Sequence, residues 1–371
     1  MKKVLMFLLA FVAIFTLVAC KKTDDGKKDD EKAEIAVVTD IGQLRDGGFN
    51  EGTYTGVENY AKANNKTYAY YQPKNGNSAT DDDRIAAMEQ AIENGAKVIV
   101  TPGFLQYAAL DKVAGDNPDV KFIFIDGWNF GKSNVTAVSY KEEESGFLAG
   151  YAAVKDGYTK LGGTFGGGGA NAACNRFAYG YVQGINAAAK ELGIEVEAKI
   201  SFNYGAGFSA SPELATQISG WYKTGTQIVF SCGGSMLQSV KSAAAENEGA
   251  MIIGVDVDQA SESERVLTSA VKGLAASVEK ILGEYYAGKW DEKLADKTSN
   301  LGAADNATGL PTADASWRFK TFTKAEYEAL FAKIVAGEVV ILSDTPEKMD
   351  DLAVWAAIDL VLTNVSITLD K

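Results

Sequence analysis

Histidine is missing from the 371-residue sequence. It is the commonest general base in enzymes, the usual activator of a nucleophilic side chain and the commonest nitrogen ligand of protein-bound metals. Its absence removes the standard catalytic triads and most nitrogen-ligated metal sites. We therefore expect binding rather than catalysis, with no catalytic residues, and the sequence predicts no metal and no other cofactor.

Cysteine is also scarce, with Cys20, Cys174 and Cys232 as the whole complement. Three residues cannot supply a disulfide framework or a four-cysteine zinc site. Cys174 and Cys232 could pair with each other, but a disulfide needs a short separation that a sequence does not reveal. Two free, buried thiols are the favoured state.

Positive charge is in short supply too. The 36 lysines and arginines are outnumbered by 49 aspartates and glutamates, which gives a formal net charge of -13. Proteins that bind nucleic acid neutralise its phosphates with a basic face. No such face is visible in the sequence, so nucleic acid is excluded as a partner.

Residues 1–20 have the pattern of an export signal. Lys2 and Lys3 precede an apolar run over residues 4–19, which is too short to span a membrane comfortably. The run ends in small residues followed by Cys20, the arrangement of a bacterial lipobox. The sequence predicts a lipoprotein signal peptide cleaved before Cys20, with lipid on the new terminal cysteine and the chain held on the extracytoplasmic face of the cell membrane. The alternative is an ordinary signal peptide with an incidental cysteine.

A charged segment follows the signal. Residues 21–34 read KKTDDGKKDDEKAE and hold no large apolar side chain, so we expect a disordered, solvated tether. The fold should then begin near Ile35. Roughly 335 residues remain, more than one hydrophobic core usually serves, and two domains are expected.

Strand-like and helix-like segments alternate through the rest of the chain. Apolar runs predict strands, and residues with helical spacing predict the helices between them. The expected strands are residues 35–39, 68–71, 97–101, 121–125, 160–165, 198–202, 227–231 and 251–255; the expected helices include 49–64, 81–93, 107–114, 179–192 and 237–247. This alternation predicts an α/β protein with doubly wound parallel sheets, in which ligands bind beyond the carboxyl ends of the strands.

Three of the expected strands end in a carboxylate. Asp40, Asp126 and Asp256 each follow an apolar run, and burying such a group is costly unless its oxygens are hydrogen-bonded. Each could simply cap the following turn or helix. Asp256 also suits a sugar, because one carboxylate can accept hydrogen bonds from two neighbouring hydroxyls.

Lys272 stands at the expected start of a long helix that runs to Tyr286. The helix dipole disfavours a cation in a first turn, so a nearby carboxylate or ligand oxygen explains this lysine better than helix stability does. The alternative is a solvated surface lysine. Two further patterns indicate structure rather than function. The glycines of residues 166–169 predict a tight turn between a strand and a helix. Asp81–Asp83 predict the acidic first turn of a helix rather than a metal cluster.

The motifs taken together resemble a known family, the basic membrane protein (Bmp/Med, PnrA-like) lipoproteins, which are substrate-binding components of ABC importers for nucleosides. The resemblance covers nearly the whole mature chain. It is carried, in order, by residues 38–42, 46–52, 120–126, 144–150, 176–177, 180–181, 254–259 and 268–272.

The resemblance implies a type I periplasmic-binding-protein fold, with two doubly wound parallel-sheet lobes joined by three crossing segments that close on a ligand by hinge motion. Residues 35–140 and 261–300 would form the N-terminal lobe, and residues 141–260 and 301–371 the C-terminal lobe. The ligand would be a purine nucleoside (adenosine, guanosine or inosine), and the partners ABC permease subunits and, through the lipid, the membrane. A monomer is expected.

The resemblance also implies roles for single residues. Asn50 and Asp126 would read the base, and Asp256 with Lys272 would hold the ribose. The other expected ligand contacts are Phe208 stacking on the base, Asp40 at the floor of the site, Phe49, and the backbone at Gly234.

One departure concerns the first loop, where several relatives carry a stacking aromatic and this chain has Gln43 and Leu44. Either Phe49 takes its place or Leu44 forms an apolar lid. Another is the C-terminal extension, residues 346–371, with a helix expected over residues 352–362 that packs on the second lobe.

Three other functions remain open. A simple sugar would suit the same carboxylates and aromatic platform. A nucleoside or glycan hydrolase could use paired carboxylates such as Asp40 and Asp256. A signalling receptor could present its closed form to a sensor rather than to a permease.

Overall fold

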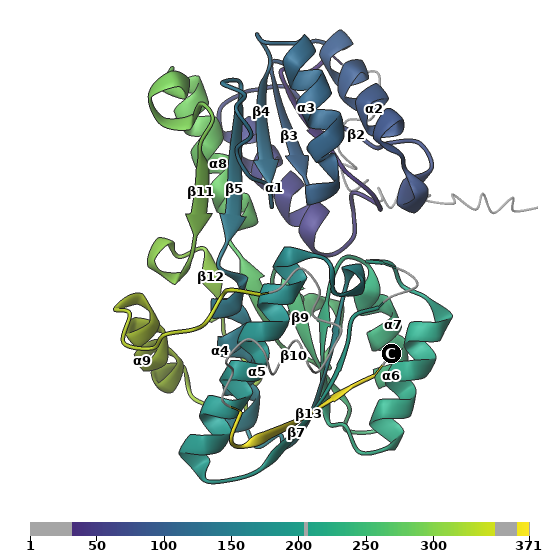
Figure 1. Ribbon diagram of the computed structural model, residues 1–371, viewed down its shortest axis with the longest axis vertical. Helices are drawn as coiled ribbons and strands as arrows, with labels where there is room; N and C mark the ends of the chain where they lie inside the picture. Colours follow the sequence, from purple (N-terminus) through teal and green to yellow (C-terminus); the bar gives the residue numbers. More distant parts are fainter. Residues whose placement is uncertain (1–31, 204–206, 346–361, 371) are drawn as a thin grey trace, which may run out of the picture.

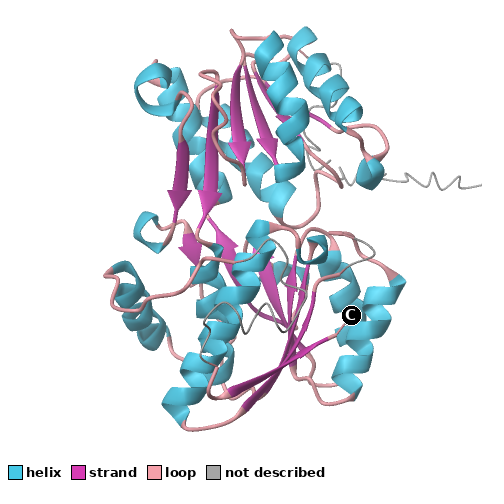
Figure 2. Ribbon diagram, in the orientation of Figure 1, coloured by secondary structure: helices cyan, strands magenta, loops and turns pink. Residues whose placement is uncertain are grey.

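The computed structural model describes residues 32–203, 207–345 and 362–370, and in this part the chain forms two lobes (Figure 1). Each lobe is built on a mainly parallel sheet with helices on both faces (Figure 2). The predicted α/β architecture is confirmed. The signal peptide, the tether as far as residue 31 and all but the last residue of the helix expected over 352–362 lie outside the described residues.

The N-terminal lobe contains a six-stranded parallel sheet in the order β11-β5-β4-β3-β1-β2. Its strands are β1 Ile35–Val38, β2 Tyr68–Tyr71, β3 Val98–Pro102, β4 Lys121–Ile125, β5 Val135–Tyr140 and β11 Thr298–Leu301, and its helices are α1 Phe49–Ala63, α2 Asp81–Glu93, α3 Tyr107–Asp116 and α8 Leu274–Tyr286. Strand residues alternate between two cores. Val37 and Ile123 pack towards α1 and α8, whereas Val38 and Phe124 pack towards α2 and α3.

The C-terminal lobe contains a seven-stranded sheet in the order β12-β10-β9-β8-β6-β7-β13. Its strands are β6 Lys160–Phe165, β7 Val196–Ser201, β8 Ile228–Cys232, β9 Met251–Asp256, β10 Val266–Lys272, β12 Thr308–Gly309 and β13 Val365–Leu369, and its helices are α4 Glu142–Lys155, α5 Ala172–Leu192, α6 Pro212–Lys223, α7 Met236–Ala245 and α9 Lys324–Val335. Only the short β12 is antiparallel to its neighbour. Apart from the added edge strand β13, the order of strands repeats that of the first lobe.

Short helical turns connect several of these elements. They are the 3-10 turns Gly76–Ser78, Phe104–Gln106, Gly167–Gly169, Ala260–Glu262 and Ala303–Asp305, and the π-helical turn Trp290–Leu294. The turn over Gly167–Gly169 joins β6 to α5, as the glycine-rich motif predicted. None of the helices that the structure describes is both long and apolar enough to cross a bilayer.

Within the described residues the chain passes between the lobes three times. It crosses at Lys141 between β5 and α4, at Gly273 between β10 and α8, and over residues 302–307 between β11 and β12. Three crossings and two sheets of matching strand order are the features of the type I periplasmic-binding-protein fold, which is thereby confirmed. The carboxyl ends of both sheets face the space between the lobes (Figure 1).

The prediction for Lys272 was wrong in one respect. Residues 266–272 form strand β10, parallel to β9, and the helix starts only at Leu274. The buried, partly β-branched sequence VLTSAVK fits the interior of a sheet, and sheet pairing decides its conformation. The expected assignment of residues 261–300 to the N-terminal lobe is therefore wrong for β10, and the crossing lies at Gly273.

The start of helix α5 also differs from expectation, for a local reason. Helix α5 begins at Ala172 rather than at residue 179, because the Asn171 side chain accepts a hydrogen bond from the Cys174 amide and caps the helix there. The end of the C-terminal extension forms β13, which pairs in parallel with β7 and covers that edge of the second sheet. Thr80 caps α2, as predicted.

Candidate functional site

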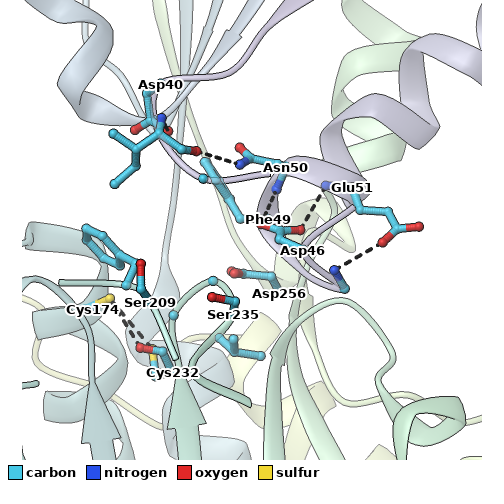
Figure 3. Close-up of a pocket in the computed structure, with 18 of the residues that line it drawn as sticks. Asp40, Asp46, Phe49, Asn50, Glu51, Cys174, Ser209, Cys232, Ser235 and Asp256 are labelled. Atoms are coloured by element: carbon cyan, nitrogen blue, oxygen red, sulfur yellow. Dashed lines mark hydrogen bonds between the residues drawn. The ribbon is translucent and has the colours of Figure 1, made fainter. Parts of the chain in front are cut away.

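A cleft with a volume of about 480 Å³ lies between the lobes, at the carboxyl ends of the strands. This volume is within the range of small-molecule sites. All eight residues predicted to contact a ligand line it, namely Asp40, Phe49, Asn50, Asp126, Phe208, Gly234, Asp256 and Lys272. Figure 3 shows Asp40, Phe49 and Asn50 across the same space from Asp256 and Cys232. Residues more than 200 positions apart are thus brought into one site.

The first turn of α1 is held in place by Asp46. Its carboxylate accepts hydrogen bonds from the backbone amides of Gly48 (2.9 Å), Asn50 (3.0 Å) and Glu51 (3.1 Å). Such a cap satisfies amides that would otherwise lack partners at the start of the helix. It fixes the turn from which Phe49 and Asn50 reach the cleft.

Asn50 lines the cleft and has a side-chain acceptor without a partner among the residues that the structure describes. Its Nδ2 donates to the carbonyl oxygens of Ile41 (3.1 Å) and Gln43 (3.2 Å), which fixes the orientation of the amide. Its Oδ1 is buried and has no hydrogen-bond partner within the described part of the chain. A buried acceptor without a partner is costly, so this oxygen is suited to a ligand N–H or O–H donor.

Asp40 lies at the end of β1 and is 7 % exposed. Its Oδ1 accepts a hydrogen bond from the Ile41 amide at 2.6 Å, while the Arg84 Nε donates to its backbone carbonyl at 3.0 Å. Burial raises the pKa of the Asp40 carboxyl from 3.8 to about 7, against the lowering effects of the Ile41 amide and the Arg84 charge.

This shift predicts a pH-dependent stability. Between about pH 4 and pH 7 the folded chain keeps the Asp40 proton that the unfolded chain has lost, so this contribution to stability declines over that interval. Roughly 2 kcal/mol of the decline falls between about pH 5.5 and pH 7, and we expect Asp40→Asn, whose side chain does not ionise, to lack it. Urea denaturation of the unliganded protein at several pH values measures it. Parallel pH profiles for both proteins would contradict the assignment.

A charge network centred on Lys272 joins the two lobes. The Lys272 Nζ lies 2.6 Å from Asp126 Oδ2, 3.2 Å from Glu142 Oε1 and 3.7 Å from Asp256 Oδ1. The Arg176 Nε donates to Glu142 Oε2 at 2.6 Å. The Lys272 side chain is 2 % exposed, so the alternative of a solvated surface lysine is wrong and the expected carboxylate partners are present.

The network sets the protonation of its carboxyls. Burial raises the pKa of Asp256 to about 7, although the Lys272 charge opposes the shift. Burial also raises the pKa of Asp126, again opposed by Lys272. At Glu142 burial alone would raise the pKa, but Lys272 and Arg176 outweigh it and lower the pKa below its usual value. Glu142 is therefore the permanent counter-ion of the two cations.

Asp126 and Asp256 share an unusual backbone conformation. Their φ angles are 54° and 67°, in the left-handed region that few residues other than glycine adopt. Aspartate tolerates this region better than most side chains, and strain of this kind concentrates at functional sites. Asp126 Oδ1 is buried without a hydrogen-bond partner among the described residues, so it is a second free acceptor.

Aromatic rings form the apolar part of the cleft. Phe208 packs on the backbone of the loops after β6 and β8, where a methyl group on Gly166 would collide with its ring and one on Gly233 would lie 3.1 Å from it. Phe49 and Phe177 also line the cleft, with the Lys272 Nζ 5.1 Å and 5.5 Å from their ring centres.

The positions of Leu44 and Phe49 decide which of them takes the place of the aromatic residue missing from the first loop. Leu44 is 3 % exposed and belongs to the core between the first sheet and helices α1 and α8, so it is not an apolar lid. Phe49 is the aromatic residue of this region that lines the cleft.

Several lining residues were not singled out from the sequence. They are Arg45, Phe104, Asn171, Cys174, Phe177, Ser209, Ser235, Gln238 and Glu262 among others. Most lie in strand-end loops or in the first turn of the helix that follows. Their place in the fold, and not their residue type, is what could have identified them as cleft residues. Arg176, which completes the Lys272 network together with Glu142, was visible only as part of the motif at residues 176–177, and Glu142 lies outside all the quoted motifs.

The comparisons with known proteins agree with this geometry. Residues 33–341 match the family model described as ABC transporter substrate-binding protein PnrA-like. The chain is 29 % identical over 309 residues to the ABC transporter nucleoside-binding protein BmpA of Lactococcus lactis, covering 76 % of this chain and 84 % of that protein. It is 30 % identical over 318 residues to basic membrane protein D of Borreliella burgdorferi, covering 84 % and 86 %.

A solved structure supports the fold. An ABC transporter solute-binding protein from Aeropyrum pernix superposes with a TM-score of 0.71 at 20 % identity, over 88 % of this chain and 96 % of that one. The family match covers most of the chain and the cleft lies where the type I fold places its ligand. The chain therefore belongs to the PnrA-like family of ABC transporter substrate-binding proteins.

Proposed function

We propose that this protein captures a purine nucleoside (adenosine, guanosine or inosine) between its lobes and delivers it to ABC permease subunits. The observation that carries the proposal is the composition of one cleft. It combines carboxylates at strand ends, two buried oxygen acceptors without partners in the described part of the chain (Asn50 Oδ1 and Asp126 Oδ1), and the Phe208 ring packed on glycine backbone. The name of the Lactococcus lactis relative, a nucleoside-binding protein, supports the same ligand class.

Each part of the cleft has a matching part of a nucleoside. Asp256, oriented by Lys272, would accept hydrogen bonds from the two ribose hydroxyls. Asn50 Oδ1 and Asp126 Oδ1 would accept from N–H groups of the base, and Phe208 would stack on one face of it. Phe49 would cover the other side of the ligand, and Asp40 would lie at the floor of the site. The Gly234 backbone would lie beside Phe208.

Binding rather than catalysis suits these groups. The protein has no histidine to move a proton, and Asp256 is already engaged by Lys272. A hydrolase that used Asp40 and Asp256 would convert added nucleoside. Mass spectrometry distinguishes binding from hydrolysis. The protein is incubated with nucleoside and denatured, and we expect the released nucleoside to be intact. Recovery of free base and sugar would support the hydrolase, and a retained hexose the sugar receptor.

The proposal includes a lipid anchor on Cys20 that holds a monomer on the outer face of the cell membrane. The charged start, apolar run and small residues before Cys20 support it. A labelled fatty acid should be incorporated by the natural chain and not by a Cys20→Ala variant.

The charge of the cleft predicts that nucleotides are rejected. Six lining residues carry a carboxyl group, Asp40, Asp46, Glu51, Asp126, Asp256 and Glu262. The two cations among the described lining residues are both paired, Arg45 with Glu51 at 3.0 Å and Lys272 with Asp126. A phosphate would meet carboxyl groups and no unpaired cation among these residues, and a buried anion without a partner is costly. We expect a nucleoside 5′-monophosphate to bind at least about 100-fold more weakly than its nucleoside by titration calorimetry. Equal affinities would contradict this account.

Phe208 provides a test of stacking. A base on an aromatic ring contributes about 1–3 kcal/mol, so Phe208→Leu should weaken nucleoside binding roughly 10- to 100-fold. Phe208→Tyr keeps a flat ring and should stay close to the natural affinity. Fluorescence or calorimetric titration distinguishes the two variants. If leucine binds as tightly as phenylalanine, the base lies elsewhere.

A further inference from the structure

Two cysteine thiols face each other in the wall of the cleft. The Sγ atoms of Cys174 and Cys232 lie 3.9 Å apart, and both residues line the cleft (Figure 3). Cys174 lies in the first turn of α5, and Cys232 is the last residue of β8. Both thiols are free and buried, as the sequence analysis favoured.

We propose that Cys174 and Cys232 are a modification site, at which a small disulfide entering the open cleft converts them into a reversible disulfide that weakens ligand binding. The effect on nucleoside affinity rests on the function proposed above. The formation of the bond does not.

The chemistry is thiol–disulfide exchange in two steps. Cys174 is the more exposed of the two residues, at 6 % against 1 %, so the reagent should reach it first. Its thiolate attacks one sulfur of the reagent, forms a mixed disulfide and releases one small thiol. Cys232 then attacks the Cys174 sulfur, closes the protein disulfide and releases the second small thiol. The protein loses two electrons and two protons, and the reagent gains them.

The second step should be slow near neutral pH. Burial, together with the neighbouring Cys174, raises the pKa of the Cys232 thiol well above its usual value. The thiolate that must close the bond is therefore scarce, and the rate of closure should rise with pH.

Closing the bond must move the wall of the cleft. A disulfide bond is about 2.05 Å long, so the sulfurs must approach by roughly 1.9 Å. The Cys232 carbonyl accepts a hydrogen bond from the Gly166 amide at 2.8 Å, and Gly233 follows directly in the chain. Gly166 and Gly233 are the backbone on which the Phe208 ring rests. Oxidation would thus shift the backbone that supports the Phe208 ring.

A bound ligand should oppose the modification. The two thiols are part of the lining of the same cleft that the ligand fills, so a ligand would block the path of the reagent. Oxidation should therefore be slower when ligand is bound. Separately, the oxidised protein should bind ligand more weakly, because the backbone under the Phe208 ring has shifted.

The test treats the full-length, reduced protein with hydroxyethyl disulfide, with and without saturating adenosine, guanosine or inosine. Peptide mapping should find a Cys174–Cys232 linkage, formed several-fold more slowly with nucleoside. The oxidised protein should bind nucleoside at least about tenfold more weakly and recover on treatment with dithiothreitol. A Cys20→Ser control should behave as the natural chain. In Cys232→Ser the reagent should stop at a mixed disulfide on Cys174.

The outcomes are separable. Absence of the linkage under conditions that modify the urea-unfolded chain would overturn the site, and an oxidised protein with affinity within twofold of the reduced one would overturn its effect on binding. If the reduced protein binds none of the three nucleosides, the proposed ligand is wrong, while peptide mapping still decides whether the disulfide forms.

Discussion

Replacing Asp256 with alanine should abolish nucleoside binding and leave the protein folded. The carboxylate is 5 % exposed, lines the cleft, and in the proposed complex accepts both ribose hydroxyls. Hydrogen bonds to a charged group contribute about 1.5–3 kcal/mol each, so losing two should weaken binding at least about 100-fold. Titration calorimetry and the thermal shift caused by nucleoside should both show the loss.

The fold should tolerate this change. Burial raises the Asp256 pKa to about 7, which means that its charged form is not stabilised by the fold. Unliganded Asp256→Ala should therefore stay folded and melt only slightly below the natural protein, since alanine tolerates the φ of 67° at this position less well than aspartate does. Asp119→Ala, in an exposed turn of the first lobe, is the matched control and should keep full binding. A normal nucleoside-induced shift in Asp256→Ala would refute the ribose contact.

Replacing Lys272 with methionine should damage both stability and binding. Methionine keeps much of the side-chain length, but it removes the cation that lies within 4 Å of Asp126, Glu142 and Asp256. Removing one partner of a buried ion pair typically costs about 3–5 kcal/mol, because it leaves uncompensated charge. We expect a loss of this size in the free energy of unfolding, measured with urea, together with the loss of nucleoside binding.

A second substitution separates the two effects. Adding Asp126→Asn to Lys272→Met removes one of the stranded carboxylates and should recover part of the stability without recovering binding. Lys280→Met, on the exposed surface of α8, is the control for losing a lysine. If Lys272→Met unfolds at the same urea concentration as the control, the network does not support the fold.

Much of the fold followed from local patterns. The strands at Lys121–Ile125 and Lys160–Phe165 have the predicted bounds, because short apolar runs between turn residues leave few alternatives to a buried strand. The strand-end aspartates could also be placed from the sequence. In parallel sheets all carboxyl ends lie at one edge, so Asp40, Asp126 and Asp256 had to approach the same side of their sheets.

The Lys272 network depended on contacts that no local pattern contains. Strand β10 looked like the start of a helix because the residues after Gly273 are strongly helical, and only pairing with β9 fixes it as a strand. Glu142 lies 130 positions before Lys272 in the sequence and meets it only through the three-crossing topology. Phe177 likewise reaches the cleft from α5, whose start depends on the Asn171 cap.

Titration calorimetry of the purified, reduced and ligand-free protein with adenosine, guanosine, inosine and glucose tests the central proposal most directly. We expect at least one nucleoside to bind with one-to-one stoichiometry, to be recovered unchanged and to bind far more tightly than glucose. Binding of glucose with no heat from any of the three nucleosides would contradict it.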